Sequence, residues 1–461
     1  MGLDVDGLTG RIVTPADPDY PLARQGYNRG VQHFPAVIDY CATRWDVRNA
    51  VNWAVRRCAP LRVRSGTHHY EGYSNGNGVL VIDVSRMNGL ELMESEGLLY
   101  VQAGVTNREV YEFLAARGYP FPGGTCPTVG LSGYAAGGGW GLSCRMFGLG
   151  CDSLEELELV GADGEFLTAD RNRNPDLFWA CRGAGGGNFG ALVSMTFRLP
   201  PRRERVTLIE ISYPHEVPES EQAAFLLAWQ EWLSIAGPRM TLQGRIFNSE
   251  DAGHSMLARG FFYGPPKEAE AILRPFLRLN GAKASVKELP FLEAVNAIGS
   301  TYPPFEKFQS VSRFARKNLS TKEAASLVAL IQERAPGSIY AGLSLYALGG
   351  KVAEIASDET AFYYRDAKYI LWLNTMWEDQ HFAEANDAWI RERFPEFAAP
   401  TCGSYGNFPY GELPDYLAEY YGANVPRLRE VKSKYDPGNV FSFPQEIPGA
   451  SPVTMARRSE M

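Results

Sequence analysis

The sequence contains few of the residues that build metal sites and disulfide frameworks. Its 461 residues include seven cysteines, at positions 41, 58, 126, 144, 151, 181 and 402, and six histidines. No two cysteines are separated by two residues, and the histidines do not follow the spacing of a zinc site. A metal site is therefore not expected. The odd, widely spaced set of cysteines favours a reducing compartment over a disulfide framework.

Long apolar runs and an excess of basic residues are also absent. No uninterrupted apolar run reaches the roughly eighteen residues of a membrane span. The formal net charge is −8, which disfavours nucleic acid or an anionic membrane as a partner, because those surfaces are bound through Lys and Arg. The N-terminal stretch MGLDVDGLTG has acids where a signal peptide has basic and apolar residues. We therefore expect a cytoplasmic protein.

Glycine is concentrated in the stretch GGTCPTVGLSGYAAGGGWG, which runs from Gly123 to Gly141. We expect it to form neither a regular helix nor a buried strand. A flexible linker is the alternative, but linkers of this kind lack bulky apolar residues. Leu131, Tyr134 and Trp140 interrupt the glycines here. The pattern favours a loop whose backbone approaches a cofactor.

Helical and strand patterns alternate around this stretch. Residues 46–58 have apolar side chains at helical spacing, with Asp46 as the expected N-cap. Thr106 and Glu109 have the spacing of a capping box at the start of the next helix. Residues 153–169 are typical of a hairpin with an Asp-Gly turn. Such alternation indicates strands and helices whose loops meet at one site.

The pattern changes after Pro200 and Pro201. Strand-like stretches such as VTLIEISY and MTLQGRIF follow, together with amphipathic helix patterns at 222–234 and 267–279. A chain of this length exceeds what one compact core usually holds. We therefore predict a separate domain at about 203–395, built as an antiparallel sheet with helices on one face.

His68 and Cys126 each lie in a glycine-containing loop that follows a strand-like stretch. An imidazole or a thiolate in such a loop is a candidate nucleophile, ligand or covalent attachment point for a cofactor. Residue type alone leaves these possibilities open, and it also leaves open that neither residue has a chemical role.

Four segments carry a resemblance to a known family. They are RSGTHHYEGYS at 64–74, GTCPTVGLSGYAAGGGWGL at 124–142, DLFWACRGAGGGNFGALVSMTFRL at 176–199 and KYDPGNVFSFPQEIP at 434–448. With these segments the sequence resembles the berberine bridge enzyme-like branch of the vanillyl-alcohol oxidase flavoprotein superfamily. The resemblance implies an α+β fold. A PCMH-type FAD-binding domain would be formed by both chain ends, 1–202 and 396–461, with the substrate domain at 203–395 inserted between them.

The resemblance also implies an FAD that is attached covalently at two points. His68 would bond to the 8α-methyl carbon of the flavin and Cys126 to C6, while the loop from Ser65 to His69 would bind the pyrophosphate through backbone N–H groups. The implied FAD-binding residues are Arg64, Ser65, Gly66, Thr67, His68, His69, Gly72, Gly104, Cys126, Thr128, Val129, Gly130, Ser132, Gly133, Gly137, Gly138, Trp140, Gly141, Gly187, Asn188, Gly190, Val193 and Asn407.

The sequence departs from the family at its usual catalytic base. The family's YxNY motif corresponds to YGNF at 405–408, so Phe408 stands where the second tyrosine is often the base. Phenylalanine cannot accept a proton. The candidates to replace it are Tyr405, Tyr410 and Tyr70, each of which needs a lowered pKa to act as a base near neutral pH.

Other departures and matches concern the surroundings of the flavin. Thr67 replaces the second glycine before the attachment histidine, and His69 adds a candidate hydrogen-bond donor. Trp140 stands where plant members commonly have a tyrosine, and it would enlarge and dry the pocket. Val129 occupies the position of the family's oxygen gate, which favours an oxidase over a dehydrogenase.

The sequence therefore predicts an FAD-linked oxidase that takes hydride from an alcohol or hemiacetal C–H group. The predicted small-molecule substrate is a carbohydrate or a hydroxylated natural product, with molecular oxygen as the acceptor that gives hydrogen peroxide. The alternatives are oxidative cyclisation or C–C bond formation, and a dehydrogenase with another acceptor. A flavin-binding protein without turnover is a further alternative, for which Phe408 is the main argument.

Overall fold

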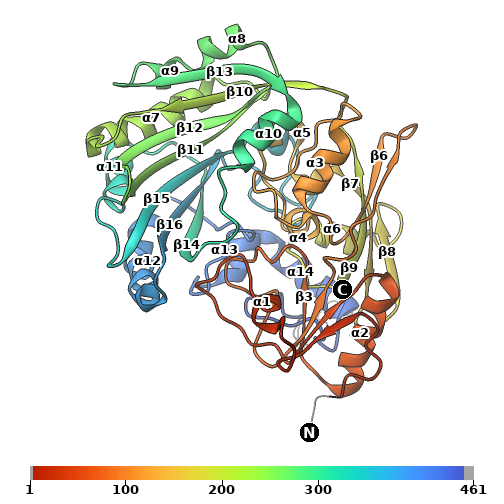
Figure 1. Cartoon of the computed structure of the whole chain (residues 1–461). Coiled ribbons are helices and arrows are strands. Elements are labelled where there is room, and N and C mark those ends of the chain that lie inside the picture. The colour runs from red at the N-terminus through yellow and green to blue at the C-terminus, as the bar shows by residue number, and fades with distance from the viewer. Residues whose placement is uncertain (1–3, 451–461) are drawn as a thin grey trace, which may run out of the picture.

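The computed structural model describes residues 4–450 and contains three β-sheets (Figure 1). Two smaller sheets come from the N-terminal part of the chain. In sheet order, the first contains β1 (Arg11–Val13), β2 (Val37–Tyr40), β4 (Leu80–Asp83) and β3 (Leu61–Arg64), of which β2 and β3 run parallel to β4. The second, antiparallel sheet contains β5 (Leu90–Met93), β6 (Leu98–Gln102), β9 (Ala191–Arg198), β7 (Leu154–Val160) and β8 (Phe166–Asp170).

The helices of this part follow the predicted pattern with two corrections. Thr43, not Asp46, is the N-cap of α2, and Asp46 instead completes the capping box three residues later. The glycine-rich stretch does contain a short helix, α4. Its apolar side chains pack into the core, and this burial outweighs the low helix propensity of the glycines. Thr106 caps α3 as predicted. The helices are α1 (Tyr20–Ala23), α2 (Arg44–Arg57), α3 (Asn107–Ala115), α4 (Leu131–Ala136), α5 (Cys144–Phe147), η1 (Gly150–Ser153) and α6 (Pro175–Ala180).

The third sheet is large and antiparallel throughout. Its strands, in sheet order, are β13 (Lys283–Pro290), β10 (Arg205–Ser212), β12 (Gly253–Phe262), β11 (Met240–Ser249), β15 (Ser338–Ala347), β16 (Tyr369–Trp377) and β14 (Phe308–Ala315). With the smaller sheets and their helices it confirms the predicted α+β class.

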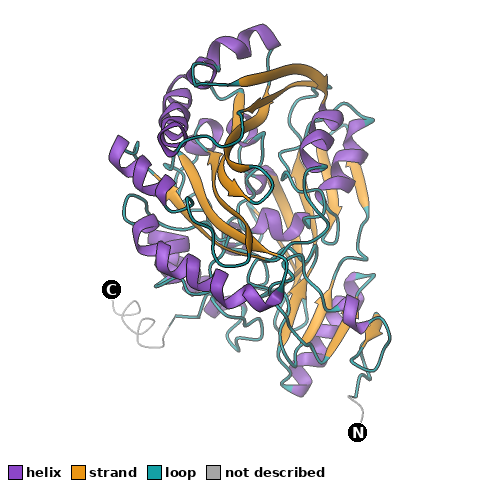
Figure 2. Cartoon of the chain, turned by 60° about the vertical axis from the view of Figure 1, so that its left-hand side comes forward, coloured by secondary structure: helices purple, strands orange, loops and turns teal. Residues whose placement is uncertain are grey.

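Long helices cover the outer side of the large sheet, while loops and short helices such as α5 lie between it and the smaller sheets (Figures 1 and 2). The helix predicted at 267–279 is interrupted at Leu273, because Pro275 lacks the N–H group that a continuous helix needs there. The helices of this part are α7 (Glu219–Ile235), α8 (Pro266–Ile272), α9 (Arg274–Leu277), α10 (Phe291–Gly299), α11 (Thr321–Ala329), η2 (Gly350–Glu354), η3 (Gln380–Phe382) and α12 (Ala383–Ala398).

The C-terminal segment returns to the N-terminal part, as the blue ribbon in Figure 1 shows. It contains α13 (Tyr416–Tyr421), η4 (Gly422–Asn424) and α14 (Val425–Tyr435). The predicted boundary at residue 395 falls inside α12, whereas the one at 202 falls between β9 and β10. The last eleven residues of the predicted C-terminal part, 451–461, lie outside the described residues.

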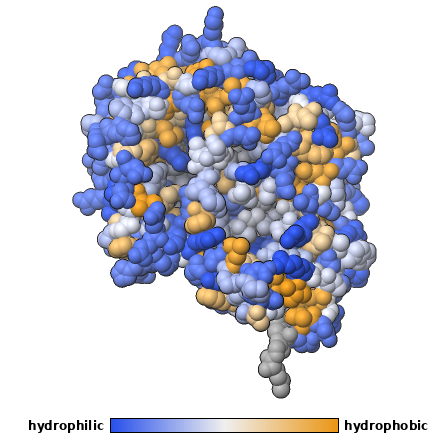
Figure 3. Space-filling view, in the orientation of Figure 1, coloured by the Kyte–Doolittle hydropathy of each residue, from blue (hydrophilic) through white to orange (hydrophobic). Residues whose placement is uncertain are grey.

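The visible surface is mainly hydrophilic. Hydrophilic side chains cover most of the face in Figure 3, and apolar ones gather in small patches. Among the helices of residues 4–450, none is long and apolar enough to cross a bilayer.

Candidate active site

A cavity lies where the loops of the two smaller sheets meet the large sheet and the C-terminal segment. It brings together residues that are far apart in the sequence, including most of the predicted FAD-binding residues. The predicted residues that line it are Ser65, Gly66, Thr67, His68, His69, Tyr70, Cys126, Val129, Gly130, Ser132, Gly133, Trp140, Gly187, Asn188, Tyr405 and Asn407.

The other predicted FAD-binding residues are not among the described residues that line the cavity. Arg64 forms a buried ion pair with Asp83 at 2.6 Å. A Cβ atom on Gly141 would lie 2.0 Å from a backbone oxygen, so this glycine serves close backbone packing. The residues outside the lining are Arg64, Gly72, Gly104, Thr128, Gly137, Gly138, Gly141, Gly190 and Val193.

His68 and Cys126 meet at one hydroxyl group. The hydroxyl oxygen of Thr128 lies 2.8 Å from Nε2 of His68 and 3.6 Å from Sγ of Cys126. The imidazole also stacks on the ring of Tyr27, with ring centroids 4.1 Å apart. Burial lowers the pKa of His68 to about 3, which keeps the imidazole neutral, and burial raises the pKa of the Cys126 thiol.

The loop that carries His68 has a strained backbone at Thr67. The φ angle of Thr67 is +61°, in the left-handed region that β-branched residues rarely adopt. Its carbonyl oxygen accepts a hydrogen bond from the backbone N–H of Tyr27 at 3.0 Å, which helps to hold this conformation. The glycine that is typical of the family at this position would adopt this φ angle without strain. Thr67 adopts it with strain, so the backbone next to His68 is strained in this chain.

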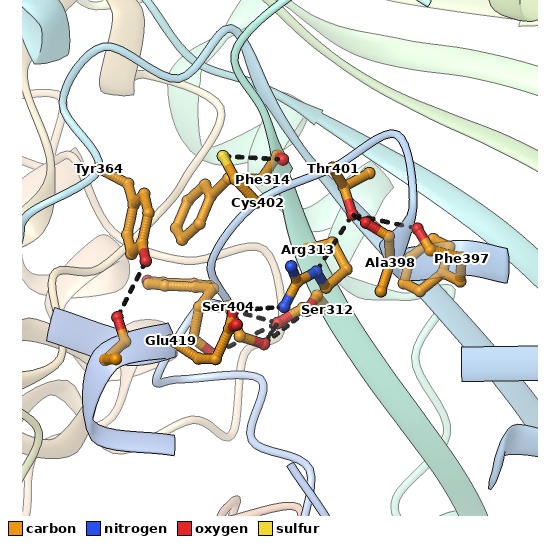
Figure 4. A network of polar contacts seen from close by, with 12 residues as sticks. Ser312, Arg313, Phe314, Tyr364, Phe397, Ala398, Thr401, Cys402, Ser404 and Glu419 are labelled. Atoms are coloured by element: carbon orange, nitrogen blue, oxygen red, sulfur yellow. Dashed lines mark hydrogen bonds and ion pairs between the residues drawn. The ribbon is translucent and has the colours of Figure 1, made fainter. Parts of the chain in front are cut away.

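Tyr405 is fixed by the pairing of the C-terminal segment with β14. Backbone hydrogen bonds join Phe314 and Cys402, and Ser404 and Ser312 are in contact beside them (Figure 4). The hydroxyl of Ser312 accepts the backbone N–H of Tyr405 at 3.0 Å. These bonds set the place from which the Tyr405 ring enters the cavity.

The phenol oxygen of Tyr405 is surrounded by N–H donors. It accepts hydrogen bonds from the backbone N–H groups of Gly139 at 3.0 Å and Trp140 at 3.1 Å, and from the side-chain amide of Asn407 at 3.1 Å. Burial raises the pKa of Tyr405 to about 12, although these hydrogen bonds act in the opposite direction. The hydrogen bonds by themselves favour negative charge on this oxygen, but burial outweighs them.

The two other predicted bases differ in position. Tyr70 lines the cavity and stacks on Phe408, with ring centroids 5.4 Å apart, and burial raises its pKa well above the ordinary value. Tyr410 is not among the described residues that line the cavity. Its ring packs against Phe394 and its hydroxyl lies 3.4 Å from Glu412, so the prediction that it reaches the site is not supported by its position.

Sequence reasoning missed the part of the cavity that the large sheet supplies. The strands contribute Arg245, Tyr340 and Tyr346, and the segment before β14 adds Tyr302 and Glu306, so this wall contains a cation, a carboxyl group and several phenols. A usable signal was present in MTLQGRIF at 240–247, where polar residues alternate in a strand that is otherwise apolar. In a sheet whose outer face is covered by helices, such alternation marks the side that faces a polar cavity.

Two family models match the chain. Residues 35–170 match the FAD binding domain, and residues 404–448 match the family described as berberine and berberine like. The FAD-linked oxidoreductase YgaK of Bacillus subtilis is 38% identical over 449 residues, which cover 96% of this chain and 97% of the relative. The chain belongs to the berberine bridge enzyme-like family of FAD-linked oxidoreductases.

Solved structures of berberine bridge enzyme-like proteins share the whole fold. BBE-like 1 of Physcomitrella patens has a TM-score of 0.88 at 26% identity and covers 96% of this chain and 98% of its own. A glucooligosaccharide oxidase from Acremonium strictum, described with a 6-S-cysteinyl, 8α-N1-histidyl FAD, has a TM-score of 0.87 at 22% identity, with 96% and 97% covered. The fold and the flavoenzyme class are thereby confirmed.

Proposed function

We propose that this FAD-linked oxidoreductase holds its flavin through two covalent bonds, one to His68 and one to Cys126. The observation that carries the proposal is that both side chains contact the hydroxyl of Thr128, at 2.8 and 3.6 Å. The two attachment atoms of a bicovalent flavin, the 8α-methyl carbon and C6, lie on the same side of the ring system, so their protein partners must be neighbours. The Thr128 contact occupies Nε2 of His68 and leaves Nδ1 for a bond.

The reaction that the site supports is oxidation of an alcohol or hemiacetal C–H group of a carbohydrate or a hydroxylated natural product. When bound, FAD supplies the hydride acceptor and passes the electrons on, and we propose molecular oxygen as the final acceptor, with hydrogen peroxide as product. The glucooligosaccharide oxidase named above, which shares the fold, supports a carbohydrate substrate. Val129 lines the cavity at the position proposed as the oxygen gate.

We propose Tyr405 as the residue that takes the proton of the substrate hydroxyl, with the bound oxidised flavin lowering the pKa that burial raises. Among the three predicted tyrosines, its oxygen accepts two backbone N–H bonds, which stabilise the charge left when a phenol gives up its proton. Phe408 cannot take this role, and its ring instead packs edge-on against Tyr405, with centroids 5.0 Å apart.

Attachment of the flavin is tested on the purified protein. After denaturation and precipitation, the yellow colour is expected in the pellet, and mass spectrometry of a digest is expected to find flavin on peptides that contain His68 and Cys126. Cys126→Ala should keep one bond, whereas His68→Ala with Cys126→Ala should keep none. Flavin that is released from the wild-type protein by acid would contradict the proposal.

The reaction is tested by anaerobic mixing with a panel of alcohols and sugars, followed by a peroxide assay in air. Bleaching of the flavin band by a substrate, with peroxide formed on admission of oxygen, is the expected result. Bleaching without peroxide would exclude oxygen as the acceptor and favour a dehydrogenase. If no alcohol or sugar bleaches the flavin, the proposed reaction is wrong.

A further inference from the structure

The face of the large sheet that borders the cavity is polar. Arg245 on β11 pairs with Ser344 on β15, and Ser344 pairs with Trp372 on β16. Side chains on neighbouring strands at paired positions lie on the same face, and positions two residues away share that face. Tyr346 and Asn374 therefore lie on the same face as Arg245, and all three line the cavity.

The opposite face of these strands is apolar. Ile246, Leu343 and Leu373 occupy the intervening positions, are fully buried and belong to the hydrophobic core. The sheet thus separates an apolar layer under its helices from a polar wall on the cavity side. A polar wall that served packing alone would be costly to bury, because polar groups lose their hydrogen bonds to water.

Several side chains of this wall, Gln243, Ser344 and Trp372 among them, have buried polar atoms without a hydrogen-bond partner among the described residues. Nε of Arg245 is buried and has no hydrogen-bond partner within residues 4–450, and the same is true of Oδ1 and Nδ2 of Asn374. Buried amides in folded proteins are normally hydrogen-bonded. Asn374 offers one donor and one acceptor group, which is the pair that a hydroxyl group requires.

The charge of Arg245 also lacks a counter-ion in direct contact. No ion pair of Arg245 is found within residues 4–450, and the carboxyl group of the cavity wall, Glu306, accepts a hydrogen bond from the hydroxyl of Tyr27 at 3.0 Å. Burial disfavours the charged guanidinium, but the phenols of Tyr340, Tyr302 and Tyr346, together with the more distant carboxyl group of Glu306, outweigh it and raise the pKa of Arg245. The cavity therefore contains a permanent cation.

We propose that Arg245 binds a carboxylate of the substrate and that Asn374 binds a hydroxyl group beside it. The substrate class is then a hydroxylated carboxylic acid, an inference that rests on the proposed alcohol oxidation. A guanidinium matches a carboxylate through two parallel N–H···O bonds, which an amide or a single hydroxyl cannot reproduce. A monoanionic carboxylate suits a wall with one permanent cation and aromatic neighbours better than a dianionic phosphate does.

The test compares acids with their neutral amides. One pair is D-glucuronate and D-glucuronamide, and the other is 4-(hydroxymethyl)benzoate and its amide, so that sugar acids are distinguished from aromatic acids. Anaerobic flavin reduction gives the KM and the limiting rate for each compound. We expect at least one acid to have the lower KM in its pair. Arg245→Gln should raise that KM by about 10–100-fold, which is the usual cost of losing hydrogen bonds to a charged group, and should change the value for the amide by less than about threefold.

A matched variant controls for general damage to the sheet. Arg205 lies on β10 of the same sheet, donates to the backbone oxygen of Glu288 at 2.9 Å and is not among the described cavity-lining residues, so Arg205→Gln should affect acid and amide alike. Arg245→Lys keeps the charge but not the two parallel bonds, and we expect an intermediate KM for the acid. Equal losses for acid and amide in Arg245→Gln would overturn the proposal.

A binding measurement separates this inference from the proposed reaction. Glucuronate and benzoate are titrated into the holoenzyme, and the shift of its melting temperature and of the flavin spectrum is recorded. Binding to wild type that is lost in Arg245→Gln supports the carboxylate site even if no compound is oxidised. If neutral alcohols reduce the flavin but neither acid binds, the proposed oxidation stands and the carboxylate site is refuted.

Discussion

Lys432 connects the C-terminal segment to a second glycine-rich loop, RGAGGGNFG at 182–190, and its replacement provides a sharp test of the fold. Its ammonium group is buried and donates to the carboxylate of Asp436 at 2.8 Å, to the backbone oxygen of Asn188 at 2.8 Å and to that of Phe441 at 2.7 Å. Asn188 lines the cavity. We therefore expect Lys432→Met to weaken both the stability of the protein and its retention of flavin.

The expected loss of unfolding free energy in Lys432→Met follows from the burial of both charges. The side chains of Lys432 and Asp436 are 1% and 0% exposed, and removal of one partner from a buried ion pair costs about 3–5 kcal/mol. Asp436 keeps hydrogen bonds from the backbone N–H groups of Val440 at 2.7 Å and Phe441 at 2.9 Å, which favours the lower end, about 3 kcal/mol. The free energy of unfolding in urea measures this loss.

Lys434→Met is the matched control two residues along α14. Its ion pair with Asp176 is also short, 2.7 Å, but the side chain of Lys434 is 58% exposed, so the expected loss is about 0–1 kcal/mol. Adding Asp436→Asn to Lys432→Met should recover part of the loss, because no buried charge is then left unpaired. A loss below about 1 kcal/mol in Lys432→Met would refute the reasoning.

Three further predictions concern the site. Tyr405→Phe removes the proposed base and leaves two N–H groups unpaired, so flavin reduction should slow by about 10²–10⁴-fold in stopped-flow measurements, and an unchanged rate would exclude the role. Gly141→Ala places a Cβ atom 2.0 Å from a backbone oxygen and should lower flavin content, whereas Gly237→Ala, away from the cavity, meets nothing within 4 Å and should be neutral or stabilise by about 0.4–1 kcal/mol; equal effects would contradict the packing argument. Burial lowers the pKa of His69 to about 4, so the unfolded state, with a pKa near 6.5, binds more protons between these values. Stability should therefore fall as pH drops from about 6.5 to 4, less steeply in His69→Asn, and identical slopes would exclude this cause.

The sequence was sufficient to predict elements that local signals determine. The capping box at Thr106 and the hairpin at 153–169 depend on residues close together in the chain, and both are present. The misplaced N-cap of α2 is an error of the same local kind, because Thr43 and Asp46 are both good capping residues and their reciprocal hydrogen bonds decide between them.

The polar wall of the cavity could not be predicted from local sequence signals, because it depends on strand register. Arg245 and Ser344 are about a hundred residues apart, and a one-residue shift in their pairing would turn Arg245 toward the helices. The position of Tyr410 has a similar cause. Tyr410 lies five residues after Tyr405, but the chain turns in between and directs the Tyr410 ring to Phe394.

Tyr405 is held by two separate parts of the structure, the large sheet and the glycine-rich stretch. Its backbone is held by Ser312 on the large sheet, while its phenol oxygen is held by backbone N–H groups of the glycine-rich stretch at Gly139 and Trp140. A shift of either part moves the proposed base relative to the other part. Substrate contacts on the large sheet and flavin contacts on the glycine loops therefore cannot be optimised independently. The C-terminal segment has to pair with β14 before both parts of the site are aligned.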